Sequence, residues 1–217
     1  YKRQVYFYEK RSDNLNRYNI PSPIATVINW SYCVSNGYLV FIPDVVFRKG
    51  EPGASSYDAV VSGVKSLIDR YDFIDKDRIA LNGHSWGGYQ IAFLVTRTNM
   101  FKAAVSGAPV VNMTSAYGGI RWESGKSRMF QYEQTQSRIG GTLWDKPAEF
   151  IRNSPLFFLP QVQTPVLIMH NDKDGSVMWE QGIEFFMALR RLDKPVWLFN
   201  YKGEGLSLIH ISEPTRP

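Results

Sequence analysis

The chain has 217 residues, of which 44% are hydrophobic and 21% charged, a balance typical of a packed globular protein and not of a disordered one. The formal net charge is +5, but basic and acidic residues are interspersed, so we expect neither a nucleic-acid partner nor a membrane partner. No apolar run reaches the ~18 residues of a membrane-spanning helix. The single cysteine, Cys33, excludes an intrachain disulfide framework and a cysteine-based zinc cluster.

Strand-like and helix-like stretches alternate along the whole chain. We expect strands at residues 4–8, 38–42, 78–82, 102–106, 165–170 and 195–201. We expect helices at residues 24–34, 56–71 with Ser56 as cap, 86–96, and a last one whose buried face is Trp179, Ile183, Phe186 and Leu189. Residues 111–160 show only weak periodicity, which indicates an inserted, partly helical segment, called the excursion below. This alternation predicts an α/β fold, in which a mainly parallel sheet of six strands carries helices on both faces.

A short glycine-rich motif lies between the third predicted strand and the helix that follows it. Residues 83–88 read GHSWGG, which matches G-x-S-x-G in the strand–turn–helix setting of a nucleophile elbow. Such a turn projects the hydroxyl of Ser85 above the sheet edge, and it aims the backbone N–H of Trp86 at the developing oxyanion. The alternative is an ordinary tight turn in which Ser85 caps the helix. The flanking strand and helix favour the elbow.

An acidic loop follows the fifth predicted strand and supplies the expected partner for a serine nucleophile. In this fold the chain order is serine, then an acid, then a histidine. Asp172 and Asp174 both lie at the carboxyl end of that strand. The alternative is a solvated turn rich in Asp and Gly, but the elbow upstream makes a catalytic acid the better interpretation.

The chain resembles the catalytic domain of prolyl oligopeptidase family serine peptidases, in particular the dipeptidyl-peptidase-like branch. The matching motifs are residues 83–89 (GHSWGGY), 108–110 (APV) and 170–177 (HNDKDGSV), within a similarity that runs from about Tyr6 to Gly205. The resemblance implies an α/β-hydrolase fold truncated at both ends, a peptide substrate and an N-terminal β-propeller elsewhere in the full-length protein. It identifies Asp174 as the acid, and we expect no metal and no cofactor.

The resemblance also implies an oxyanion site and a substrate pocket. Tyr8 matches the position of a tyrosine that donates to the oxyanion together with Trp86, although a strand-end aromatic packed on the sheet is an equal alternative. Trp86, Val110 and Val177 match the lining of the first specificity pocket. This apolar lining suits a proline-like or small apolar side chain, but the aromatic residues of proline-specific members are missing after Val110, so a strict proline preference is not expected.

The catalytic histidine of the family is missing from its expected place. The family motif puts it directly after Gly205, where this chain has Leu206. Residues 206–217 resemble a translated sequencing adapter, so we expect a catalytic domain over residues 1–205 followed by a non-native tail. We expect none of the three histidines, His84, His170 and His210, to replace the base, with His170 instead anchoring the acid loop. The chain is therefore expected to be a serine peptidase by family and inactive as it stands.

Two other functions remain open from the residues alone. The first is a carboxylesterase on the same fold, which a His-Gly-Gly-Gly segment before the elbow would have supported; none is present. The second is a non-catalytic interaction module that keeps the fold. Such a module is expected to lose its nucleophile or its acid, and both are present in this chain.

Overall fold

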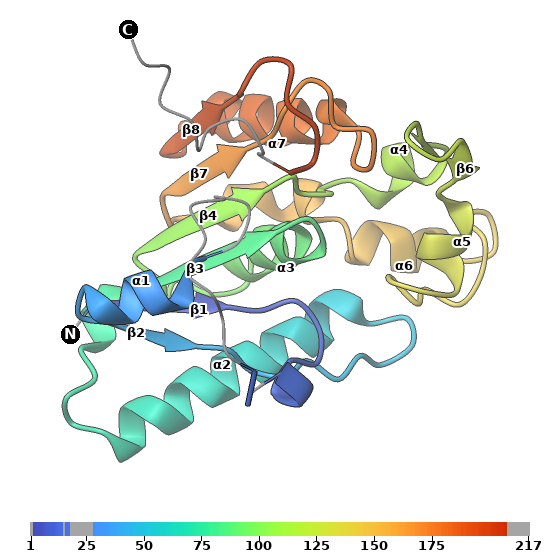
Figure 1. Ribbon diagram of the computed structural model, residues 1–217. Coiled ribbons are helices and arrows are strands. Elements are labelled where there is room, and N and C mark those ends of the chain that lie inside the picture. Colours follow the sequence, from blue (N-terminus) through green and yellow to red (C-terminus); the bar gives the residue numbers. More distant parts are fainter. Residues whose placement is uncertain (1, 15, 18–27, 208–217) are drawn as a thin grey trace, which may run out of the picture.

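The computed structural model describes residues 2–14, 16–17 and 28–207, and its centre is a parallel sheet (Figure 1). The six strands are β1 (Lys2–Tyr6), β2 (Tyr38–Phe41), β3 (Ile79–His84), β4 (Ala103–Gly107), β7 (Val166–Met169) and β8 (Val196–Phe199). Their order is β2-β1-β3-β4-β7-β8, and every neighbouring pair is parallel. The six-stranded parallel sheet predicted from the alternating pattern is therefore confirmed.

The strand order places a topological switch between β1 and β3. The chain passes from β1 outward to β2 and then returns to β3 on the other side of β1. In open α/β sheets the crevice at such a switch, beyond the carboxyl ends of the strands, is where ligands bind. Tyr8 follows β1 and Ser85 follows β3, so both flank this crevice.

Four helices connect the strands, and three short 3-10 turns complete the connections. The helices are α1 (Trp30–Ser35), α2 (Pro52–Arg70), α3 (Trp86–Val95) and α7 (Trp179–Arg191), and the turns are η1 (Ser12–Asn14), η2 (Lys76–Arg78) and η3 (Pro155–Gln161). The connection from β1 to β2 through α1 runs toward one edge of the sheet. The connections through α2, α3 and α7 run toward the other edge. Because parallel crossovers are right-handed, α1 covers one face and the other three cover the opposite face. All ten residues of α3 are buried, so this helix forms the centre of the core.

Several element boundaries differ from the sequence expectation. The second helix begins at Pro52, which suits the first turn of a helix, so Ser56 is not its cap: its hydroxyl donates to the carbonyl of Pro52 from inside the helix. In α7 the buried stripe contains Phe185 and Leu189, and Ile183 is exposed. The first predicted helix lies partly outside the described residues, and its described part begins at Trp30.

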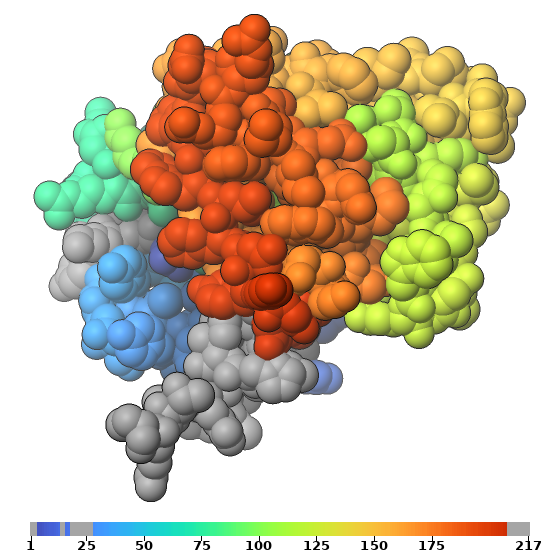
Figure 2. Space-filling model, turned by 90° about the horizontal axis from the view of Figure 1, so that it is seen from above, coloured from blue at the N-terminus to red at the C-terminus, as the bar shows by residue number. Residues whose placement is uncertain are grey.

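The excursion after β4 is partly helical, as predicted, and lies at the carboxyl end of the sheet (Figure 1). It contains α4 (Met113–Tyr117), the two-stranded ribbon of β5 (Ile120–Arg121) and β6 (Lys126–Ser127), α5 (Met129–Glu133) and α6 (Pro147–Arg152). In the view from above, this yellow-green to yellow segment lies beside the orange C-terminal third of the chain (Figure 2). The excursion therefore forms one wall of the region above the strand ends.

Candidate active site

Ser85 occupies a strained turn between β3 and α3. Its backbone has φ 57° and ψ −116°, a conformation that non-glycine residues adopt at a cost of about 1–3 kcal/mol. The turn is held because the N–H of Ser85 donates to the carbonyl of Gly107 at 2.8 Å and the N–H of Tyr89 donates to the carbonyl of Ser85 at 3.1 Å. Ser85 itself is half-buried, so its hydroxyl is not sealed in the core.

Three glycines around Ser85 allow the backbone to turn this tightly. A Cβ on Gly83 would lie 2.7 Å from the carbonyl oxygen of Gly87, and a Cβ on Gly87 would lie 2.7 Å from that of Phe7. A Cβ on Gly88 would overlap the carbonyl oxygen of Gly107. The obstacles are backbone atoms that cannot rotate away, so the glycines of the motif are sterically required at these positions.

Two donors flank the turn at the positions expected for an oxyanion site. Trp86 is the first residue of α3, so its N–H has no carbonyl partner within the helix and points out of the helix N-terminus. Tyr8 lies beside the same turn, because its ring would be 3.8 Å from a Cβ on Gly87. The hydroxyl of Tyr8 accepts a hydrogen bond from Gln136 Nε2 at 3.0 Å, which leaves the hydroxyl proton available for another acceptor.

Asp174 is held in a buried loop after β7, on the second strand from β3. Its Oδ1 accepts hydrogen bonds from the backbone N–H groups of Ser176 and Val177, both at 2.8 Å. Its Oδ2 is buried and has no hydrogen-bond partner among the described residues. The carboxylate is thus oriented by its own loop, and Oδ2 can accept a further hydrogen bond.

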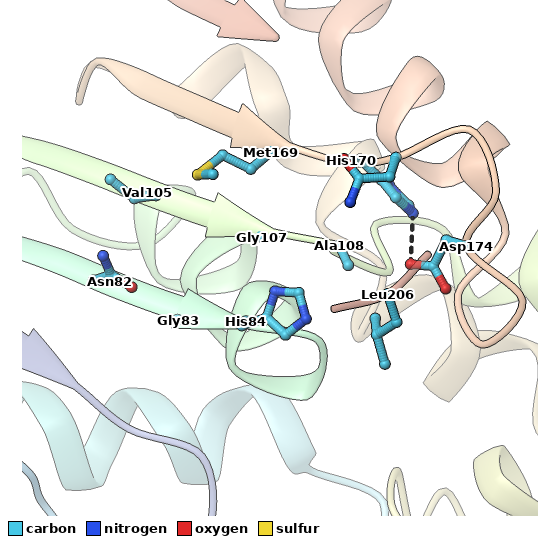
Figure 3. A pocket seen from close by; sticks show the side chains of 11 residues that line it. Asn82, Gly83, His84, Val105, Gly107, Ala108, Met169, His170, Asp174 and Leu206 are labelled. Atoms are coloured by element: carbon cyan, nitrogen blue, oxygen red, sulfur yellow. Dashed lines mark ion pairs between the residues drawn. The ribbon is translucent and has the colours of Figure 1, made fainter. Parts of the chain in front are cut away.

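Asp174 and residue 206 line one small cavity, and Oδ2 of Asp174 lies toward His170 (Figure 3). This cavity, of about 40 Å³, is bounded by His84 and Ala108 as well as by Asp174, His170 and Leu206. Leu206 is brought there by a docked backbone: Asn171 Nδ2 donates to the carbonyl of Gly205 at 2.7 Å. The structure therefore places the side chain that follows Gly205 next to the acid, as the family motif requires of its histidine.

The segment before Gly205 is fixed to the acid loop by further hydrogen bonds. The N–H of Gly203 donates to Oδ1 of Asp172 at 2.8 Å, and the N–H of Lys173 donates to the carbonyl of Glu204 at 3.2 Å. Asp172, the second acidic candidate, therefore binds the docked segment, whereas Asp174 faces the cavity. This difference agrees with the choice of Asp174 as the acid.

The two described histidines lie at this site in different ways. His170 Nε2 is 3.1 Å from the carbonyl oxygen of Val177, and because a carbonyl only accepts, Nε2 carries the proton and anchors the loop, as expected. The same nitrogen is 3.3 Å from Asp174 Oδ2. Burial lowers the pKa of His84, an effect that attraction to Asp174 opposes and repulsion from His170 reinforces. His210 lies outside the described residues.

The three residues expected to line the substrate pocket belong to one buried apolar cluster. Trp86, Val110 and Val177 are all buried, and side chains from the excursion complete the cluster. The Trp86 ring stacks on Tyr89 at a centroid distance of 4.4 Å and contacts Phe47 at 5.9 Å. Elements far apart in the sequence therefore meet beside the Ser85 turn.

Two neighbours of the site were not identified from the sequence. Gln136, which donates to Tyr8, is separated from it by 128 positions, and nothing in the local sequence of either residue indicates the contact. Arg128 has a buried side chain although its neighbours Ser127 and Met129 are exposed. A charged residue in a weakly periodic segment gives no sequence signal of burial.

No metal centre or membrane segment is found in the described part of the chain. Among residues 2–14, 16–17 and 28–207, no group of three or more His, Cys, Asp or Glu side chains is placed to hold a metal ion. Within the same ranges, no helix has the length and apolar content that crossing a bilayer would need.

The fold and the site together define an α/β-hydrolase, with a serine on a strained strand–helix turn at the switch point of a parallel sheet. More specifically, the chain belongs to the prolyl oligopeptidase family of serine hydrolases, because the sequence model of that family matches residues 26–210. The resemblance inferred from the three motifs is thereby confirmed.

Individual relatives and solved structures agree with this assignment. The chain is 30% identical over 170 residues to the uncharacterized peptidase YuxL of Bacillus subtilis, covering 76% of this chain and 24% of that protein. It is 29% identical over 164 residues to the acylamino-acid-releasing enzyme of Rattus norvegicus, covering 75% and 22%. A putative dipeptidyl aminopeptidase IV from Bacteroides ovatus superimposes with a TM-score of 0.74 at 21% identity, covering 96% of this chain and 29% of that one. The chain thus spans about a quarter of the length of these curated relatives.

Proposed function

We propose that this chain carries the acyl-transfer site of a serine peptidase in which Ser85 is the nucleophile and Asp174 orients a histidine at position 206. The observation that carries the proposal is the shared cavity: Asp174, whose Oδ2 is buried and accepts no well-formed hydrogen bond, lines it together with residue 206. A histidine there would donate one ring N–H to Asp174 and use its other nitrogen to take the proton of Ser85.

The oxyanion of the tetrahedral intermediate would be held by two groups. The N–H of Trp86 benefits from the helix N-terminus, and the hydroxyl of Tyr8 has its own proton free because it accepts from Gln136. The acyl part of the substrate would lie against Trp86, Val110 and Val177, whose clustering supports one apolar pocket beside the nucleophile.

The leucine at position 206 determines whether this chain can be catalytically active. Leucine cannot take up a proton, and a serine without a general base is a weak nucleophile. Removing one member of a serine triad costs on the order of 10⁴–10⁶ in turnover. We therefore propose that the chain with Leu206 is nearly inactive.

The relatives support a peptidase that acts near peptide N-termini. Their names include acylamino-acid-releasing enzyme and dipeptidyl peptidase 8, and both describe release of a terminal unit. We propose a substrate of this class for the full-length protein, with the parts of the relatives outside this chain contributing to its selection.

Labelling by a fluorophosphonate probe tests the proposal. We expect the unaltered chain to label very slowly, Leu206→His to label rapidly and stoichiometrically, and Leu206→His combined with Ser85→Ala not to label. Leu206→Gln is the matched control, because it introduces a polar side chain that cannot act as a base at neutral pH. Rapid labelling of the unaltered chain, or no labelling of a folded Leu206→His variant, would contradict the proposal.

Turnover by the Leu206→His variant then separates a peptidase from an esterase. A peptidase is expected to cleave dipeptide anilides as well as short acyl esters. Cleavage of the esters alone would favour a carboxylesterase on the same fold.

A further inference from the structure

Arg128 is a buried cation beside the proposed substrate pocket. Its side chain is only 4% exposed, and it is the only lysine or arginine among the buried residues of the described chain. Arginine stays protonated in proteins, so burial cannot neutralise it. Such a side chain normally has a carboxylate partner or a full set of hydrogen bonds.

The guanidinium lacks these partners within the described residues. Nε and Nη1 of Arg128 have no hydrogen-bond acceptor there, and none of the ion pairs formed there includes Arg128. The two acids nearest along the chain, Glu123 and Glu133, accept the hydroxyls of Ser176 and Tyr117 instead. Two buried N–H donors of the charged Arg128 side chain, Nε and Nη1, therefore lack an acceptor among the described residues.

The position of Arg128 indicates where that acceptor would lie. The guanidinium carbon is 5.7 Å from the centre of the Tyr132 ring, and Tyr132 belongs to the same buried cluster as Trp86, Val110 and Val177. Burial raises the pKa of the Tyr132 hydroxyl, and both the charge of Arg128 and a hydrogen bond from its side chain oppose this effect. The guanidinium therefore meets Tyr132 at one end of an otherwise apolar cluster, while its Nε and Nη1 are left without an acceptor in the described chain.

A backbone hydrogen bond also connects Arg128 to Gly119, which packs against the loop after β7. Its N–H donates to the carbonyl of Gly119 at 2.9 Å. A Cβ on Gly119 would lie 2.8 Å from the sulfur of Met178, the residue after Val177. The excursion therefore holds Arg128 against the strand-end loop that carries the proposed pocket wall.

We propose that Arg128 recognises a carboxylate on the substrate residue that enters this pocket, so that the enzyme prefers an acidic side chain there. The methylene groups of a glutamate would pack against Trp86 and the two valines, and its carboxylate would accept a charge-assisted hydrogen bond from Nε or Nη1 of the guanidinium. The inference rests on the proposed function for the location of the pocket, and it changes the expected substrate from small and apolar to acidic.

Binding of two matched dipeptides to the unaltered chain tests the inference without any turnover. Alanyl-glutamate and alanyl-glutamine have nearly the same shape and differ in side-chain charge. Calorimetric titration is expected to show alanyl-glutamate binding about tenfold more tightly or better, because hydrogen bonds to charged groups are worth more than neutral ones. Equal affinities, or no measurable binding of alanyl-glutamate to the folded chain, would overturn the inference.

Variants at position 128 test whether Arg128 causes the preference for alanyl-glutamate. Arg128→Met keeps the length of the side chain and is expected to bring the affinity ratio close to one, whereas Arg128→Lys keeps the charge, loses the directed N–H groups of the guanidinium and retains part of the ratio. Arg97→Met is the matched control, because Arg97 also lies over aromatic rings, at 4.1 Å from that of Phe158, outside this cluster. An unchanged ratio in a folded Arg128→Met or Arg128→Lys chain would overturn the inference.

The two proposals fail in different measurements. If Leu206→His does not label with fluorophosphonate while the dipeptide ratio depends on Arg128, the proposed triad is wrong and the carboxylate site stands. If labelling succeeds and the ratio is one, the carboxylate site is wrong and the proposed triad stands.

Discussion

Asp174 and Leu206 line one cavity from two separate loops, and Oδ2 of Asp174 is buried, 3.3 Å from His170 Nε2, without a well-formed hydrogen bond in the described chain. A buried carboxylate oxygen that lacks a well-aligned donor costs free energy, on the order of 1–3 kcal/mol. An imidazole at position 206 would remove this cost by donating to that oxygen. The arrangement is therefore easier to explain as a site for histidine than as a site for leucine.

The two acidic residues of the loop after β7 are expected to differ sharply in their effect on turnover. In the Leu206→His background, Asp174→Asn should lower kcat by about 10⁴, because an amide no longer orients the imidazole or stabilises its charged form. Asp172→Asn is the matched control: its Oδ1 accepts from the N–H of Gly203, and an asparagine oxygen retains this bond. Steady-state kinetics on a dipeptide anilide measures both, and a larger loss from Asp172→Asn would contradict the assignment.

Tyr8 is expected to stabilise the transition state and not to strengthen substrate binding. Tyr8→Phe in the Leu206→His background should reduce kcat by about 10²–10³ with little change in KM, the size of effect seen when one oxyanion donor is removed. Tyr38→Phe, at the start of β2, is the control for loss of a tyrosine hydroxyl elsewhere. A change in KM alone would instead favour packing as the role of Tyr8.

Much of the fold follows from local patterns in the sequence. The run at residues 38–42 and the run at 165–170 are continuous and apolar, which is typical of strands in a parallel sheet, and they form the half-buried edge strand β2 and the inner strand β7. The expected start of α2 at residue 56 is wrong, because Pro52 begins the helix and Gly53 packs closely on the ring of Phe93. That contact is a tertiary one, which local sequence does not show.

The candidate site was predictable where a motif fixes the backbone. The elbow glycines could be identified because turn geometry restricts the allowed residues, whereas the acid loop was expected from the order of the triad along the chain and from the family resemblance. The burial of Arg128 and the bond from Gln136 to Tyr8 were not, because they depend on how the excursion folds back onto the sheet. Such long-range contacts carry no periodic signal.

The glycine after the elbow should be intolerant of even a methyl group. Gly88→Ala would press its Cβ against the carbonyl oxygen of Gly107, so we expect a loss of more than about 3 kcal/mol in the free energy of unfolding, at or beyond the upper end for overpacking. Gly118→Ala is the matched control, because nothing lies within 4 Å of its added Cβ and its φ is −77°. Urea unfolding followed by circular dichroism measures both, and equal losses would contradict the steric argument.

His84 makes the stability of the chain depend on pH in a defined direction. Burial, the largest cause, lowers its pKa in the folded state below the ordinary value of 6.5, so the unfolded chain takes up a proton first as the pH falls. The contribution of His84 to stability is therefore intact above about pH 6.5 and is lost progressively below it, down to the folded-state pKa.

Replacing His84 with glutamine is expected to make the melting temperature less sensitive to acid. Between about pH 7.5 and pH 5, the unaltered chain should lose more of its Tm than the His84→Gln chain, while the difference between the two should stay constant above pH 7. His170 is present in both chains, and its repulsion of a protonated His84 is part of the effect that the substitution removes. Differential scanning calorimetry across this range measures the two slopes, and parallel slopes below pH 6.5 would show that His84 is not held in its neutral form by burial.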